Sequence, residues 1–189
     1  FYMAYTDQLV VTGAVNDVGG AVRTNVDKSF RRGLELSLNW QVNQQFSVSP
    51  NLTWSQNKID AFTDIVIDFS DFSLVEENKM NTDIALSPNF IFGNRISYQP
   101  TEGLNLSVLN KYVSQQYLDN TSNDSRTLDA YFVNDLVASY SIKNKIVKDL
   151  TIKLLVNNIL SESYSSNGYT FSYIFGDLIT ENFYYPQAE

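Results

Sequence analysis

A two-residue alternation in the stretch Leu150–Tyr164, LTIKLLVNNILSESY, constrains the fold of this chain most tightly. Successive side chains of a β-strand point to opposite faces of the sheet. Leu150, Ile152, Leu154 and Val156 therefore share one face, opposite Thr151, Lys153, Leu155 and Asn157. A strand with one apolar and one wet face fits a soluble sheet packed on a core. It equally fits a membrane barrel whose apolar face meets lipid and whose wet face meets the lumen.

The same alternation recurs along most of the chain. In Arg31–Val42, for example, Leu34, Leu36 and Leu38 alternate with polar residues. The predicted strands are Phe1–Val11, Arg31–Val42, Phe46–Phe62, Asp83–Tyr98, Leu104–Leu118, Asp129–Ile142 and Leu150–Tyr164, and an eighth begins in Asn182–Glu189. We expect Pro88 near a strand start, because proline cannot donate to a central ladder. The pattern predicts an all-β fold, an antiparallel meander of long strands.

The connections between these strands alternate in length. Long loops are predicted at Thr12–Asn25, Thr63–Thr82, Asp119–Thr127 and Ser165–Glu181, and short turns at Asn43–Gln45, Gln99–Gly103 and Lys143–Asp149. Antiparallel strands place alternate connections at opposite ends, so one end of the sheet carries the long loops. Outer-membrane barrels have this asymmetry, and the predicted strands are longer than the roughly 5–6 residues usual in globular sheets. We therefore expect part of a transmembrane barrel, with the lipid bilayer as a partner and the outer membrane as its location.

The segment Thr63–Thr82 is the hardest to interpret. Asp60, Asp64 and Asp68 are four residues apart, and like charges at that spacing weaken a helix. We predict a long acidic loop with a short strand extension through Ile65–Ile67.

Composition restricts the chemistry available to the chain. The formal charge is −8, and a nucleic-acid partner would need a basic face. Histidine and cysteine are both absent, which removes the usual general base, nucleophile and metal ligands. The acids Asp60, Asp64, Asp68, Asp71, Glu76, Glu77 and Asp83 lack the ordered spacing of a calcium loop. We expect no enzyme, no cofactor, no metal site and no nucleic-acid partner.

Aromatic residues give the candidate ligand contacts. They gather late in the chain as Tyr164, Tyr169, Phe171, Tyr173, Phe175, Phe183, Tyr184 and Tyr185. Those that border predicted strands are interpreted as an interface girdle. Tyr169, Phe171 and Tyr173 alternate within the predicted loop, and we take them as candidates for packing on a ligand; the alternative is packing between loops. Glu35, Lys111, Asp135 and Lys153 are expected to face the lumen, where they pair with other parts of the protein or line water.

Several short motifs, in this order and spacing, resemble the C-terminal barrel of TonB-dependent outer-membrane receptors of the Bacteroidetes type. The residues are Tyr5–Val10, Arg32–Leu36, Ser87–Asn89, Lys111–Val113 with Gln116–Ser122, Val156–Leu160 with Tyr164, and Asn182–Ala188. The resemblance implies a barrel of about 22 strands filled by a plug domain. It also implies an energy-coupling partner of the TonB type and uptake of a bulky solute, such as a ferric chelate, a glycan or a peptide.

The chain also departs from the family pattern. The family's last strand continues beyond Pro186-Gln187-Ala188, no plug is present, and Ser161 stands where the family often has Asn. We therefore expect residues 1–189 to be a C-terminal fragment of a receptor barrel, without plug and final strand. Two alternatives stay open: a barrel wall without transport that docks a surface lipoprotein, and a soluble β-rich carbohydrate-binding module. A second sheet covering Leu36, Trp40 and Leu154 would favour the soluble module.

Overall fold

The computed structural model describes residues 1–143 and 148–187, and the regular structure in these ranges is entirely β-strand. The strands are β1 (Tyr2–Val15), β2 (Ala21–Ser37), β3 (Trp40–Gln41), β4 (Phe46–Asp68), β5 (Ser73–Asp83), β6 (Phe90–Thr101), β7 (Leu104–Val113), β8 (Gln116–Tyr117), β9 (Thr127–Leu128), β10 (Tyr131–Ile142), β11 (Leu150–Val156), β12 (Ser165–Phe175) and β13 (Asp177–Pro186). Within the described ranges there is no helix long and apolar enough to cross a membrane.

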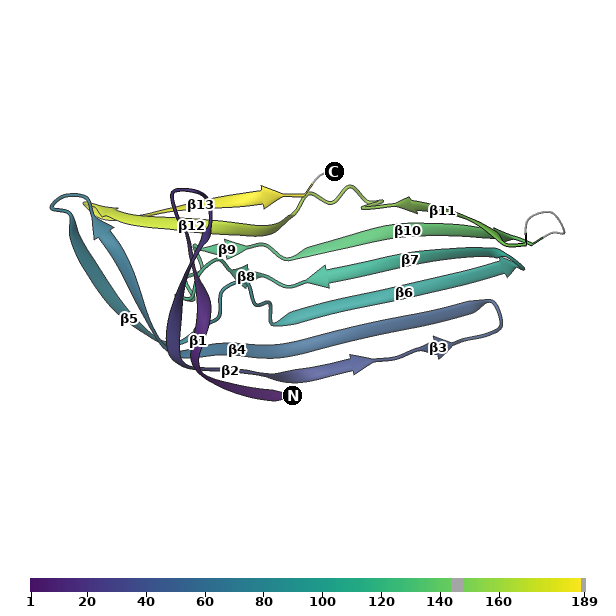
Figure 1. Cartoon of the computed structure of the whole chain (residues 1–189), viewed down its shortest axis with the longest axis horizontal. Coiled ribbons are helices and arrows are strands. Elements are labelled where there is room, and N and C mark those ends of the chain that lie inside the picture. The colour runs from purple at the N-terminus through teal and green to yellow at the C-terminus, as the bar shows by residue number, and fades with distance from the viewer. Residues whose placement is uncertain (144–147, 188–189) are drawn as a thin grey trace.

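Seven of these strands form an open antiparallel sheet in the order β1-β2-β4-β6-β7-β10-β11. The predicted all-β antiparallel meander is confirmed. In Figure 1, β4, β6, β7, β10 and β11 run side by side, and the β1–β2, β4–β5 and β12–β13 hairpins lie at the other end of the molecule, where the tips of β4–β5 and β12–β13 meet. We call residues 34–54, 90–113, 131–143 and 148–156 the wall, and residues 8–28, 56–86, 114–130 and 165–186 the folded end.

The apolar face of the wall is exposed. Leu36 is 55% exposed, Trp40 57% and Leu154 60%. Strand register brings Val48, Ile96, Val108, Leu136 and Val156 into one row across five strands. Paired residues of neighbouring strands share a face, so the apolar rows inferred from alternation are continuous. The second sheet expected of a soluble module does not cover Leu36, Trp40 or Leu154.

The predicted acidic loop Thr63–Thr82 is wrong. β4 continues to Asp68 and pairs with β5 in a hairpin, in which Val66 lies opposite Val75. Phe62 and Val66 are buried and Asp64, between them on the same face of β4, is half-buried, so this row of the segment packs inward. Burial of this row stabilises the hairpin despite its charge. The predicted extension through Ile65–Ile67 is confirmed as part of β4, and Pro88 lies two residues before β6, as expected.

Two other predicted loops are also shorter than expected. Ser165–Glu181 is largely the β12–β13 hairpin, which turns at Gly176 with φ +76°. In Thr12–Asn25, only residues 16–20 form the turn between β1 and β2, and the rest belongs to these strands. Within the turn, Asn16 Oδ1 accepts from the Gly20 amide at 2.7 Å. Turn-forming residues marked the right places, but pairing with a neighbouring strand extended each strand into the polar sequence. The short turn expected at Lys143–Asp149 lies partly outside the described residues.

The buried core lies in the folded end. One cluster joins Val10, Val26, Ile59, Phe62 and Ile84. Parts of the segment between β7 and β10 are buried as deeply, since Leu118, Asn120 and Leu128 are 0%, 0% and 1% exposed. The irregular loop expected at Asp119–Thr127 exists, but Asp119, Asn120, Thr121 and Arg126 within it are buried.

Candidate functional site

The loop between β8 and β9 is held in the folded end by hydrogen bonds. The Asn120 side chain accepts from the Ala85 amide at 2.8 Å and donates to the Val11 carbonyl at 2.6 Å. Gly13 allows β1 to approach, since a Cβ at this position would lie 2.4 Å from the Asp119 Cβ. These contacts join the loop to β1 and to the segment after β5.

A buried ion-pair cluster lies at the centre of this loop. The Arg126 guanidinium donates to Asp119 Oδ2 at 2.6 Å and to Asp64 Oδ2 at 3.2 Å. The side chains of Arg126 and Asp119 are 3% and 4% exposed, whereas that of Asp64 is 19% exposed. Burial alone would lower the pKa of Arg126, but hydrogen bonding and attraction by the two carboxylates outweigh it and raise the pKa. Arg126 is therefore charged, and it joins the loop to β4.

A second ion pair supports the other side of the loop. Lys58 Nζ lies 2.9 Å from Asp83 Oδ2, which also accepts from the Ser122 hydroxyl at 2.9 Å. Ser122 in turn accepts from the Asp83 amide at 2.7 Å. The base of the β4–β5 hairpin and the loop are thus held as one unit.

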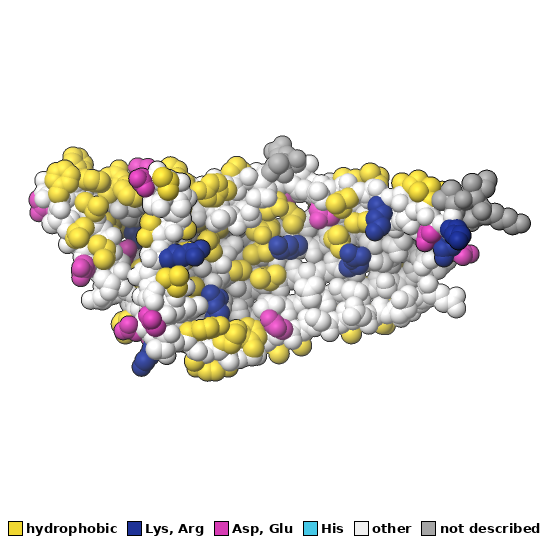
Figure 2. All heavy atoms as spheres, in the orientation of Figure 1, with side chains coloured by type: hydrophobic (Ala, Val, Ile, Leu, Met, Phe, Trp, Pro, Cys, Tyr) yellow, Lys and Arg dark blue, Asp and Glu magenta, His cyan; other side chains and the backbone are white. Residues whose placement is uncertain are grey.

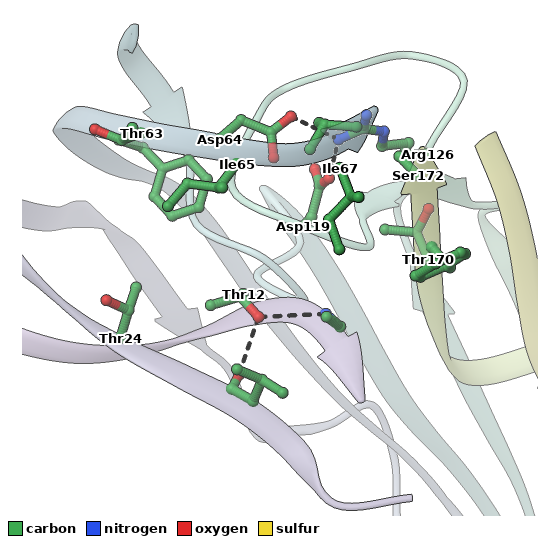
Figure 3. A pocket seen from close by; sticks show the side chains of 15 residues that line it. Thr12, Thr24, Thr63, Asp64, Ile65, Ile67, Asp119, Arg126, Thr170 and Ser172 are labelled. Carbon is green, nitrogen blue, oxygen red and sulfur yellow. Dashed lines mark hydrogen bonds and ion pairs between the residues drawn. The ribbon is translucent and has the colours of Figure 1, made fainter. Parts of the chain in front are cut away.

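A cavity of ≈ 320 Å³ opens beside the cluster (Figure 3). It lies between β1, β2, β4, β12 and the loop, and is lined by Thr12, Ala14, Val22, Thr24, Phe62, Thr63, Asp64, Ile65, Val66, Ile67, Asp119, Arg126, Thr170, Phe171 and Ser172. Figure 3 shows Asp64, Asp119 and Arg126 together on one side, with Thr12 and Thr24 across from them and Thr170 and Ser172 on a third side. The lining thus combines hydroxyls, a charged cluster and an apolar strip.

The three aromatic residues predicted to contact ligand lie along β12. Tyr169 stacks on Phe183 with ring centroids 4.8 Å apart, and Phe171 lies 5.6 Å from Tyr173. Tyr173 packs edge-on against Phe69 at 5.4 Å, where the tips of two hairpins meet. The three share one face of β12 in a continuous aromatic row, and Phe171 also lines the cavity.

The sequence pattern did not predict the polar residues that line the cavity. Thr170 and Ser172 alternate with the aromatic residues and face the cavity, and this alternation was a usable signal. The pairing of Arg126 with Asp64 was not visible, since 62 positions separate the two residues. No cluster of three or more acidic side chains suited to a metal ion occurs in the part of the chain that the structure describes.

Comparison with known proteins identifies one family. A family model described as TonB dependent receptor-like, beta-barrel, matches residues 1–159. No curated protein sequence matches the chain.

Three of the solved structures similar to this chain share its fold at low sequence identity. BauA, the ferric preacinetobactin receptor of Acinetobacter baumannii, has a TM-score of 0.57 and 14% identity, over 97% of this chain and 25% of its own. Fiu, the ferric-catecholate import receptor of E. coli K12, has a TM-score of 0.55 and 16% identity, over 88% of this chain and 21% of its own. The complex of enterobactin with a variant of PfeA, the ferric enterobactin receptor of Pseudomonas aeruginosa, has a TM-score of 0.53 and 17% identity. The match covers 88% of this chain and 24% of the PfeA chain. The chain spans about a fifth to a quarter of these structures.

Proposed function

Because this chain belongs to the TonB-dependent receptor β-barrel family, we propose that it forms part of the wall and the outer hairpins of an outer-membrane receptor. The observation that carries this proposal is the continuous apolar face of the wall, with Leu36, Trp40 and Leu154 more than half exposed. Large exposed apolar surfaces mark contacts with membranes or partners. In this proposal the wall crosses the bilayer and the folded end extends outside the cell, since outer-membrane barrels carry their longer connections there.

The proposed activity is energy-coupled uptake of a bulky nutrient: a ferric chelate, a glycan or a peptide. Fiu is described as a ferric-catecholate import receptor and BauA as a ferric preacinetobactin receptor, which favours a chelate among these classes without naming a ligand for this chain. In this proposal residues 1–189 are a C-terminal part of the barrel, of the Bacteroidetes type, and plug and final strand belong to the rest of the receptor. A TonB-type coupler acts through the plug, and a surface lipoprotein is a further proposed partner.

The wet face of the wall suits a barrel lumen. Lys111, Asp135 and Lys153 lie on the face opposite the apolar rows, and Asp135 accepts from the Asn158 amide at 2.8 Å. In the proposed receptor these charges face water or the plug. At the outer end, the aromatic row of Tyr169, Phe171 and Tyr173 offers a flat surface for ligand.

Lipid-phase labelling tests the orientation of the wall. In the full-length receptor, a fluorophore attached through Leu36→Cys or Leu154→Cys should be quenched by a quencher restricted to the bilayer interior. The same fluorophore at Glu35→Cys or Lys153→Cys, one residue away on the other face, should be quenched from water instead. Equal quenching at all four positions would reject the assignment of faces.

Uptake is tested separately with the full-length receptor in its own cells. Deletion of the energy coupler should abolish uptake of the nutrient while leaving surface binding intact. Replacement of Tyr169, Phe171 and Tyr173 by alanine should weaken binding, and the matched replacement of Phe175, which is 66% exposed on the same strand, should not. Uptake that persists without the coupler would contradict the proposed transport.

A further inference from the structure

We propose that the cavity between β1, β2, β4, β12 and the buried loop binds a cationic, hydroxyl-bearing group, of the kind that an amino sugar presents. The inference rests on the proposed function only in placing this cavity at the outer end of a receptor. A volume of ≈ 320 Å³ lies within the range of small-molecule sites, about 300–1,000 Å³.

The charge of the lining favours a cation. Its charged residues are Asp64, Asp119 and Arg126, so one negative charge is left unbalanced. Both oxygens of Asp119 are engaged, because Oδ1 accepts from the Thr121 amide at 3.0 Å and the Thr121 hydroxyl at 2.7 Å, and Oδ2 accepts from Arg126 at 2.6 Å. Asp64 uses Oδ2 for Arg126, and no described residue donates to Oδ1. The unbalanced charge therefore lies on Asp64, the most exposed member of the cluster.

The hydroxyls of the lining offer acceptors as well. Thr12 Oγ1 donates its proton to the Val22 carbonyl at 3.2 Å, and Thr170 Oγ1 donates to the Glu181 carbonyl at 3.4 Å. A hydroxyl has one proton and two lone pairs. Thr12 Oγ1 already accepts from the Ala14 amide at 3.3 Å, which leaves it one lone pair for a ligand, and Thr170 Oγ1 keeps two. An ammonium group supplies three donors.

One buried donor calls for an acceptor on the ligand or on a bound water. Arg126 Nε has no hydrogen-bond partner among the described residues, although the Arg126 side chain is 97% buried in the lining of the cavity. An unpaired buried donor costs about 1–3 kcal/mol. A ligand hydroxyl both donates and accepts, so a group that carries hydroxyls beside an ammonium satisfies Arg126 and Asp64 together.

The surroundings of the cavity reinforce its preference for cations. Residues 56–86 carry the acids Asp60, Asp64, Asp68, Asp71, Glu76, Glu77 and Asp83 against two lysines, Lys58 and Lys79. On the face shown in Figure 2, basic side chains are spaced along the wall and also lie over the β1–β2 hairpin. A cleft surrounded by one sign of charge concentrates ligands of the opposite sign. A polyanionic ligand would meet repulsion both on approach and inside the cavity.

Three sugars that differ mainly in charge test the proposal on the purified full-length receptor. Binding of glucosamine, glucose and glucuronate is measured by calorimetric or NMR titration, at a pH where the amine is protonated. We expect glucosamine to bind about tenfold more tightly than glucose, which matches one charge-assisted hydrogen bond, and glucuronate to bind weakest. Equal affinities, preference for glucuronate, or no binding of glucosamine would each overturn the proposal.

Asp64→Asn identifies the group responsible. This variant keeps the Asp119–Arg126 pair and should lower the affinity for glucosamine about tenfold, while the affinity for glucose changes little. Glu76→Gln removes an equal charge from the same hairpin without touching the cavity and should leave both affinities unchanged. If Glu76→Gln lowers the affinity for glucosamine as much as Asp64→Asn does, the preference comes from the overall negative charge of the hairpin, and the specific site is refuted.

The outcome can be separated from that of the proposed function. Outer-membrane insertion and energy-dependent uptake are measured on the same variants. Normal insertion with no preference among the sugars would refute the cavity proposal alone. Failure of insertion in the unsubstituted receptor would refute the proposed function.

Discussion

The wall and the folded end invert the usual relation between polarity and burial. Every residue of β11, from Leu150 to Val156, is exposed, although five of the seven are aliphatic. In the polar loop of the folded end, by contrast, Asp119, Asn120 and Arg126 are buried, at 3%, 0% and 2% exposure. Within the folded end, hydrogen bonds and ion pairs of the loop are buried beside the apolar cluster of Val10, Val26, Ile59, Phe62 and Ile84.

The difference shows that the two regions are stabilised by different surroundings. In the folded end buried polar side chains of the loop bind other segments, as Asn120 does with Val11 and Ala85. On the apolar face of the wall, Leu36, Trp40 and Leu154 find no cover within the described residues. Exposed apolar surface costs roughly 25 cal/mol per Å² in water, so the wall requires an apolar environment, which under the proposed function is lipid.

The largest expected effect falls on the buried cluster. Arg126→Ala leaves Asp119 buried without a counter-charge, and loss of one partner of a buried pair costs about 3–5 kcal/mol. Hydrogen exchange of the loop amides in the full-length receptor measures this loss. Lys79→Ala, which breaks the exposed pair with Glu77, is the control and should cost about 0–1 kcal/mol. Similar losses in both variants would mean that the loop is not the core of the folded end.

The next effect tests the wall. Leu36→Arg places a charge on the apolar face and should cost about 2–4 kcal/mol, the range for the bilayer midplane. The measurement is a urea titration of the full-length receptor refolding into lipid vesicles. Glu35→Arg, on the adjacent position of the opposite face, should change stability by roughly 0.5 kcal/mol or less. A negligible cost for Leu36→Arg would remove lipid as the environment of this face.

A pair of glycines tests how closely β1 packs on the loop. Gly13 and Gly176 both have positive φ, +92° and +76°, so alanine strains the backbone at either position. A Cβ at position 13 would also collide with Asp119, whereas nothing lies within 4 Å at position 176. Gly13→Ala should therefore cost about 1–3 kcal/mol more than Gly176→Ala, measured by hydrogen exchange at the Thr121 amide. Equal costs would show that the loop moves away from β1 easily.

The smallest expected effect concerns the contact between two hairpin tips. Phe69→Ala removes the edge-on contact with Tyr173, worth about 0.5–1.5 kcal/mol. Position 69 still donates its amide to the Ile174 carbonyl, at 2.9 Å in the unsubstituted chain, and faster exchange of this amide reports the loss. Phe175→Ala, at an exposed position of β12, the strand that carries Tyr173, should leave the exchange of the Phe69 amide unchanged. If it does not, the whole tip rather than the aromatic pair holds the contact.

Prediction from sequence succeeded in the wall and was incomplete in the folded end. Alternation identified the apolar rows of β2, β4 and β11, and their neighbours confirm the shared face. The same rule did not predict the β4–β5 hairpin, because Asp64, Asp68 and Glu76 hid the alternation of Phe62 and Val66. It placed Tyr169, Phe171 and Tyr173 in a loop, whereas they lie on β12, and their role in ligand binding stays a prediction.

The sequence by itself determined the strand class and the two faces of the wall, because side-chain alternation is a local property of an extended backbone. Only the tertiary structure decided which polar segments would pair or become buried. That choice depends on partners far along the chain, as when Arg126 meets Asp64 across 62 positions. From the sequence, a charged side chain is predicted to be exposed unless its partner of opposite charge is known, and only the fold shows which residue that partner is.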